Sequence, residues 1–179
     1  MKQALFAAAV AAVVSICAPS ASAWAAPAAD ATKRLGTFGD WDALMFTDGS
    51  AKTCYLAVAA GKVQGGEKGA KTTTHLTVTH RSGGKSMDEV SISGAYGFKK
   101  DSKVELRVGT KPHAMFTKGD RAWAEDAKAD KSIVDSLRKG KDAIMHATPA
   151  KGSDITATFS LAGFSDALAA ADKACGVKR

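Results

Sequence analysis

Four histidines, His75, His80, His113 and His146, are the residues of this chain that most often serve in catalytic or metal sites. His75 and His80 lie in one segment of alternating apolar and polar residues and are an odd number of positions apart. Side chains at such positions of a strand point to opposite faces, so these two histidines do not share a metal. The sequence contains no His-Glu-x-x-His motif, the pattern typical of helical zinc sites. We therefore expect four surface or half-buried histidines.

The sequence Ser82-Gly83-Gly84-Lys85 formally matches Ser-x-x-Lys, the acyl-enzyme signature of penicillin-binding enzymes. That chemistry needs the lysine one helical turn after the serine, and two adjacent glycines do not favour a helix. The partner Ser-Asp-Asn and Lys-Thr-Gly motifs are missing, as are a Gly-x-Ser-x-Gly elbow and a phosphate-binding loop. The sequence thus predicts no catalytic, cofactor-binding or metal-binding residues and no cofactor. One alternative stays open, a site assembled from distant residues such as His75, Asp88 or Glu125.

The amino-terminal sequence predicts export, and export decides whether the cysteines of this chain are expected to form a disulfide. Lys2 precedes an uncharged apolar run over residues 4–16, and Ser20-Ala21-Ser22-Ala23 offers a small-x-small cleavage pattern. This is the pattern of a signal peptide, with cleavage after Ala23 or Ala25. The run is too short for a membrane span, and the bulky Ile16 before Cys17 argues against a lipoprotein. We expect a periplasmic or secreted protein with a signal peptide over residues 1–25 and no transmembrane anchor.

Removal of this signal leaves two cysteines, Cys54 and Cys175. An even cysteine count in an oxidising compartment favours a disulfide over two free thiols. The two residues do not form the Cys-x-x-Cys motif of redox enzymes, so a structural bridge is expected. This pairing follows from counting alone.

Lysine and arginine outnumber aspartate and glutamate, 25 to 18. An exported basic protein is attracted to anionic envelope components. A possible surface for an anionic ligand comprises Lys62, Lys68, Lys71, Lys99 and Lys100. The alternative is that these lysines are solvated and keep the protein soluble. In the same way, Trp41 and Trp123 could be ligand platforms, although core or rim packing is the more common role.

The remaining pattern predicts a disordered leader over residues 26–34 and a single β-rich domain over residues 35–179. Expected strands lie at residues 38–46, 52–59, 72–80, 89–93, 104–108, 113–117, 121–125, 142–148 and 154–161. A glycine- and lysine-rich loop is expected at residues 61–71. Helices are expected at residues 132–139, with Ser132 as N-cap and Gly140 as the stop, and at residues 163–174, with Cys175 on the apolar stripe. The expected fold class is mainly β, an antiparallel β-sandwich or open barrel with two short helices.

Three short segments resemble the invasion-associated locus B family of alphaproteobacterial exported proteins. They are Phe38-Gly39-Asp40-Trp41 followed by Cys54, the late segment at residues 134–140 ending in Lys-Gly, and the closing segment at residues 159–168. The resemblance spans the mature domain and implies an envelope-associated β-sandwich without catalytic residues, linked to host-cell invasion in pathogenic members. The chain departs from the family pattern at Met45 and Phe46, where members carry an additional cysteine.

Together these features predict a non-enzymatic envelope protein that binds or supports a cell-surface component. The expected partner is an anionic envelope component or an envelope protein, and no nucleic acid. Two alternatives come from other functional classes. One is an envelope-polymer hydrolase, and the other is a secreted adhesin.

Overall fold

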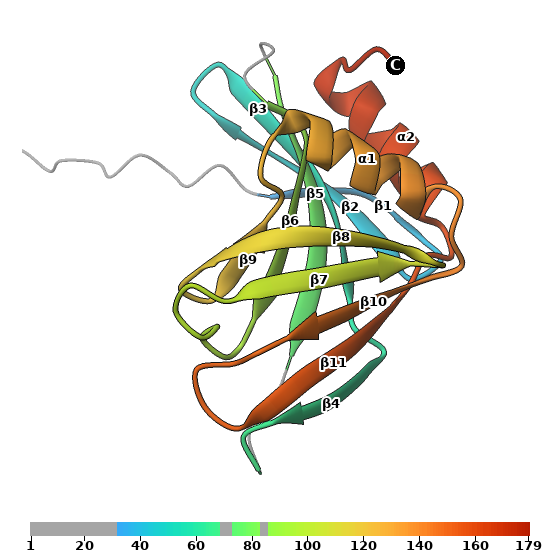
Figure 1. The fold of residues 1–179 in the computed structure, drawn as a ribbon. Coiled ribbons are helices and arrows are strands. Elements are labelled where there is room, and N and C mark those ends of the chain that lie inside the picture. The colour runs from blue at the N-terminus through green and yellow to red at the C-terminus, as the bar shows by residue number, and fades with distance from the viewer. Residues whose placement is uncertain (1–31, 69–72, 83–85) are drawn as a thin grey trace, which may run out of the picture.

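The computed structural model describes residues 32–68, 73–82 and 86–179, and it folds them into one large antiparallel sheet with two helices (Figure 1). The expected signal peptide and residues 26–31 of the expected leader lie outside the described residues. The strands are β1 (Lys33–Phe38), β2 (Trp41–Asp48), β3 (Ala51–Ala59), β4 (Lys62–Gly66), β5 (Thr74–Arg81), β6 (Ser86–Gly94), β7 (Lys103–Val108), β8 (Lys111–Lys118), β9 (Arg121–Trp123), β10 (Asp142–Ala147) and β11 (Ser153–Ser160). The first strand begins two residues before the expected start of the domain at Leu35.

The strands are ordered β1-β2-β3-β5-β6-β9-β8-β7-β10-β11-β4, and every pairing is antiparallel. The sheet bends strongly, so that its two halves face each other (Figure 1). Gly61, just after β3, donates its N–H to the Thr158 carbonyl in β11 at 3.0 Å, which brings the second half back toward the first. The sheet does not close by strand pairing between β1 and β4. The predicted fold class, mainly β with an antiparallel sandwich or open barrel and two helices, is confirmed.

Alternation along the strands divides the sheet into an inner and an outer face. Leu76 and Val78 of β5 are buried on the inner face, and their partners in β6 are the buried Ile92 and Val90. His75 and Thr77 lie on the other face of the same strand. Both helices pack on the inner face, where they complete the core.

The segment Phe38-Gly39-Asp40-Trp41 forms the tight turn of the β1–β2 hairpin, with Phe38 paired to Trp41. The Asp40 N–H donates to the Ala162 carbonyl at 3.1 Å, and the buried Trp41 Nε1 donates to the Ser160 carbonyl at 3.0 Å. The indole also packs edge-on against Phe164, at 4.9 Å between ring centroids. Trp41 is therefore a core residue that joins the first hairpin to the end of β11, as expected.

The expected loop at residues 61–71 is wrong over its first part, because residues 62–66 form the edge strand β4. Val63 pairs with Ala157 of β11, and Gly66 pairs with Ser153. Gly65 adopts a φ of 87°, and a Cβ at this position would collide with the Asp154 carbonyl. Glycine here permits the close approach of β4 to β11 rather than marking a loop. Residues 69–72 lie outside the described residues.

The first helix, α1 (Ala127–Leu137), begins five residues earlier than predicted. Its N-cap is Asp126, whose carboxylate accepts the Ala129 N–H at 2.7 Å, so the prediction of Ser132 as N-cap is wrong. The second helix, α2 (Phe164–Cys175), has the predicted extent within one residue and ends at Gly176 in a left-handed conformation. Neither helix in the described part of the chain is long and apolar enough to cross a membrane.

Candidate functional site

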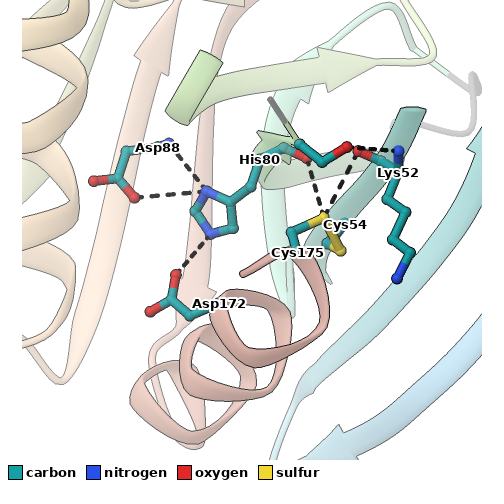
Figure 2. The surroundings of a disulfide bond; sticks show 7 residues. Lys52, Cys54, His80, Asp88, Asp172 and Cys175 are labelled. Carbon is teal, nitrogen blue, oxygen red and sulfur yellow. Dashed lines mark hydrogen bonds and ion pairs between the residues drawn. A yellow bond between two sulfur atoms is a disulfide. The ribbon is translucent and has the colours of Figure 1, made fainter. Parts of the chain in front are cut away.

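Cys54 and Cys175 form a disulfide that ties α2 to the sheet, with their Cα atoms 6.0 Å apart (Figure 2). Cys54 lies on the inner face of β3 and is wholly buried, whereas Cys175 in the last turn of α2 is half-buried. The apolar stripe of α2 brings Cys175 over the sheet because Leu168 and Ala171 of the same helix are buried against it. The bridge joins residues 121 positions apart in the sequence and so fixes the end of the chain on its first half.

A buried histidine lies beside this bridge. His80 of β5 is paired with Cys54 of β3 and has no exposed side-chain surface. Its Nδ1 accepts the Asp88 N–H at 3.1 Å, which leaves the ring proton on Nε2. The Asp172 Oδ1 lies 3.3 Å from that Nε2 (Figure 2). The expectation of surface or half-buried histidines is wrong here, because His80 falls in register with the buried Leu76 and Val78.

Arg179 closes the cluster by binding both carboxylates. Its Nη1 and Nη2 donate to Asp88 at 3.0 and 2.6 Å, and its Nε and Nη2 donate to Asp172 at 2.6 and 3.0 Å. Burial lowers the pKa of His80, although the carboxylates of Asp172 and Asp88 oppose that effect. The pKa of Arg179 is raised, mainly by its hydrogen bonds to Asp88. The cluster therefore holds one fixed cation between two anions and a neutral imidazole.

A carboxylate–histidine pair is the geometry of general acid–base catalysis, which requires contact between the imidazole and a substrate. No surface of His80 is open to solvent, so no reacting group can approach the ring in this structure. The cluster instead connects β5, β6 and α2 around the disulfide (Figure 2). Its role is to hold the end of α2 against the sheet.

The residues considered for a distant catalytic site do not come together. His75 is exposed on the outer face of β5, whereas Asp88 lies inward and binds Arg179. Glu125 is exposed beyond β9, with its carboxylate 3.8 Å from Lys103 Nζ. Within the described ranges, no group of three or more His, Cys, Asp or Glu side chains is arranged to hold a metal ion.

The other two histidines divide between core and surface. His113 of β8 is buried, and its Nε2 lies 3.0 Å from the Ser136 hydroxyl of α1, so the expectation of a surface or half-buried position is wrong here too. Burial lowers the pKa of His113, and Lys111 adds to that effect. His146 of β10 is exposed, with Nδ1 3.2 Å from the Thr156 hydroxyl, as expected.

Four of the lysines proposed as an anion-binding surface, Lys62, Lys68, Lys99 and Lys100, are exposed, but they do not all lie together. The Lys99 N–H donates to the Thr148 carbonyl, so Lys99 and Lys100 lie at the end of β10. Lys62 is at the opposite end of β4 from Lys68, because Lys62 pairs with Thr158 while Gly66 pairs with Ser153. Lys71 lies outside the described residues. The anion-binding role of Lys62, Lys68, Lys71, Lys99 and Lys100 stays a prediction.

A different surface emerges on the outer face of β2, β3, β5, β6 and β9. A hollow of about 580 Å³ lies over these strands, and we call it the outer hollow. Its floor consists of small side chains on three adjacent strands, because Ala57 pairs with Thr77 and Thr77 pairs with Ser91. Further hydroxyl groups line it from the same face. They are Thr53, Thr79 and Ser93.

Aromatic rings border the outer hollow on two sides. Phe46 and Tyr55 pack edge-on at 6.3 Å between centroids on the β2–β3 side. Trp123 of β9 stacks on Phe116 of β8 at 5.8 Å on the other side, and Phe116 is 42% exposed. Trp123 is half-buried, so it is a rim residue rather than a core residue. The sequence patterns identify the outward-facing residues of each strand, but they do not show which strands lie side by side.

Comparisons with known proteins agree on the family. The model of the family described as invasion associated locus B (IalB) protein matches residues 41–172. The crystal structure of invasion associated protein b from Bartonella henselae is similar in fold, with a TM-score of 0.54 and 19% sequence identity, covering 80% of this chain and 98% of that one. No curated protein sequence gives a significant match. Because the family match extends from Trp41 in the first hairpin to Asp172 in the last helix, this chain belongs to the invasion associated locus B family.

Proposed function

We propose that this chain is an exported periplasmic or secreted cell-envelope protein that binds an envelope component without catalysing a reaction on it. The observation that carries the proposal is the outer hollow, a polar and aromatic depression on a sheet face that no described helix covers. Sites that bind ligands are concave and combine aromatic surface with a few polar groups.

Export is supported by the disulfide and by the predicted signal peptide. Disulfides persist in oxidising compartments such as the periplasm and are rare in the cytosol. The Cys54–Cys175 bridge joins residues 121 positions apart. Such a disulfide fits a chain that folds after leaving the cytoplasm. The excess of 25 basic over 18 acidic residues would bring it to anionic envelope surfaces.

Family membership supports the link to host-cell invasion only as a role in pathogenic relatives. A secreted adhesin differs from the proposed protein in its location, and finding the chain on the cell surface or in the medium would favour the adhesin. An envelope-polymer hydrolase would need an accessible acid–base pair, whereas the His80 cluster is buried and His75, Asp88 and Glu125 are separate.

The test is co-sedimentation of the purified mature protein with outer-membrane vesicles and with peptidoglycan across a salt titration. Binding that survives about 0.15 M salt supports a specific envelope ligand, because weak attraction between exposed charges is largely screened there. Binding that disappears with modest salt, or no binding to either material, would contradict the proposal. In that case the basic charge serves solubility alone.

A further inference from the structure

We propose that the outer hollow binds an acidic glycan, whose sugar rings stack on Trp123 and Tyr55 and whose anionic groups pair with Arg121. This inference rests on the proposed function and names the chemical class of the envelope component. Three features of the hollow carry it, namely its floor, its aromatic borders and its charge.

The floor is small and polar over three strands. Ala57, Thr77 and Ser91 form one row across β3, β5 and β6, and Trp123 of β9 completes it. Neighbouring strands lie about 4.8 Å apart, so β3 and β9 are separated by about 14 Å. Hydroxyl groups donate and accept hydrogen bonds, as the hydroxyl groups of a sugar do. This floor suits a hydroxylated chain rather than a lipid tail, which needs an apolar surface.

The aromatic borders provide flat surfaces for the apolar faces of sugar rings. Trp123 ends the row on β9, and Tyr55 lies near its other end, on β3 two residues from Ala57. Each ring is held by a second aromatic residue, Tyr55 by Phe46 and Trp123 by Phe116. Aromatic side chains that are already fixed before binding lose little conformational entropy when the ligand arrives.

The charge of the hollow is set by a second row next to the first. His75 pairs with Ser93, Ser93 with Arg121, and Arg121 with Lys118. The acidic residue facing the hollow is Glu89, and its carboxylate is bound by Arg81 at 2.6 Å. Arg121 forms no ion pair with any described residue. Its guanidinium is therefore available to bind a carboxylate or phosphate through bidentate hydrogen bonds.

These charges fit a glycan better than a nucleic acid. A nucleic-acid site commonly neutralises about 6–10 phosphate groups with closely spaced Lys and Arg side chains. Among the described residues that line the hollow, Arg121 is the arginine without an ion pair, and Lys118 and His75 lie along the same row. Sparse cations among hydroxyl groups match a glycan, in which acidic groups are separated by the hydroxyl groups of the sugar rings.

The experiment uses the mature protein and three oligosaccharide probes: a galacturonate oligomer for carboxylates, the phosphorylated core oligosaccharide of lipopolysaccharide, and a neutral dextran oligomer. Affinity is measured by calorimetry and by tryptophan fluorescence, to which Trp123 contributes together with the buried Trp41. We expect an acidic probe to bind and dextran to bind at least tenfold more weakly. Arg121→Gln should weaken acidic-probe binding about tenfold, since a charged hydrogen bond is lost.

The matched control is Arg107→Gln, which removes the same charge from the outer face of β7, where Arg107 binds Glu105. The control should bind the acidic probe within about twofold of the unchanged protein. Tyr55→Val, which keeps a strand-forming residue, should weaken all probes that bind. Thermal melts of the three variants confirm that each is folded.

Equal weakening by Arg121→Gln and Arg107→Gln, or no binding of either acidic probe at millimolar concentration, would overturn the inference. If the protein still co-sediments with vesicles or peptidoglycan while both acidic probes fail, the proposed function stands and the assignment of the hollow falls. If an acidic probe binds through Arg121 but co-sedimentation is absent, the hollow is confirmed as a glycan site and the envelope role is wrong.

Discussion

Removing the Cys54–Cys175 bridge by the double substitution Cys54→Ala and Cys175→Ala should destabilise the domain substantially. In the chain-entropy account, a disulfide stabilises the fold by restricting the unfolded chain, and the effect grows with loop length. For a sequence separation of 121 residues this account gives about 5 kcal/mol, and measured losses commonly lie at about 2–5 kcal/mol. Domains of this size are stable by about 5–15 kcal/mol. At the chain-entropy value of about 5 kcal/mol, the variant loses a third or more of that stability.

Urea denaturation followed by tryptophan fluorescence measures this change. With a slope of about 2 kcal/mol per molar urea, a loss of about 4 kcal/mol lowers the midpoint by about 2 M. The unchanged protein treated with reductant is the control, because it loses the bridge but keeps both sulfur atoms. It should show most of the same shift. Any further loss in the variant measures the space left beside the wholly buried Cys54. A midpoint shift below about 0.5 M in both samples would refute the reasoning.

Three further predictions concern the charged cluster, α1 and the first hairpin. Arg179→Met leaves Asp88 and Asp172 without their shared cation. We expect a loss of about 2 kcal/mol in urea unfolding at pH 8, since Arg179 is partly exposed. The loss should become smaller as the pH falls, because the Arg179 charge is one of the causes that lower the pKa of His80, and its removal lets the imidazole take up a proton more readily beside the two carboxylates; a loss that does not decrease in acid would contradict this. Asp130 accepts the Val90 N–H at 2.8 Å, yet burial together with Glu89, Asp88 and Asp126 raises its pKa to about 6. Its folded-state pKa lies above the unfolded value, so its contribution to stability is complete below about pH 4 and is lost as the pH rises to about 6. Asp130→Asn should remove that slope from the free energy of unfolding measured against pH, and an unchanged slope would count against it. Gly163→Ala places a methyl group against the Phe38 carbonyl at a φ of 86° and should cost more than about 2 kcal/mol. Gly176→Ala, with a φ of 68° and no atom within 4 Å of the new Cβ, should cost about 1 kcal/mol; similar melting temperatures for the two variants would contradict the proposed close packing.

The parts of the fold that local patterns determine could be predicted from the sequence. Alternation identified the inner residues of β3, β5, β7 and β11, and the apolar stripe of α2 placed Cys175 on its buried side. The disulfide followed from the cysteine count once the signal peptide was set aside. In each case the signal lies within one element or in the composition.

The parts that depend on pairing between distant segments could not be predicted. The glycines of β4 are typical of a loop, and only the approach of β11 explains why they lie in a strand. The β5 alternation itself places His80 inward, but its carboxylate partners come from β6 and α2, and the sequence pattern does not show that these elements meet there. The outer hollow depends on which strands are neighbours, and the sequence alone does not give that order.

The most direct test of the account is to express the full chain in a bacterium, release the periplasm by osmotic shock and measure the intact mass with and without thiol alkylation. We expect a chain that starts at Trp24 or Ala26 in the periplasmic or extracellular fraction, with Cys54 and Cys175 unmodified until a reductant is added. A chain that retains residues 1–23, stays in the cytoplasm and is alkylated at both cysteines without reductant would contradict the account.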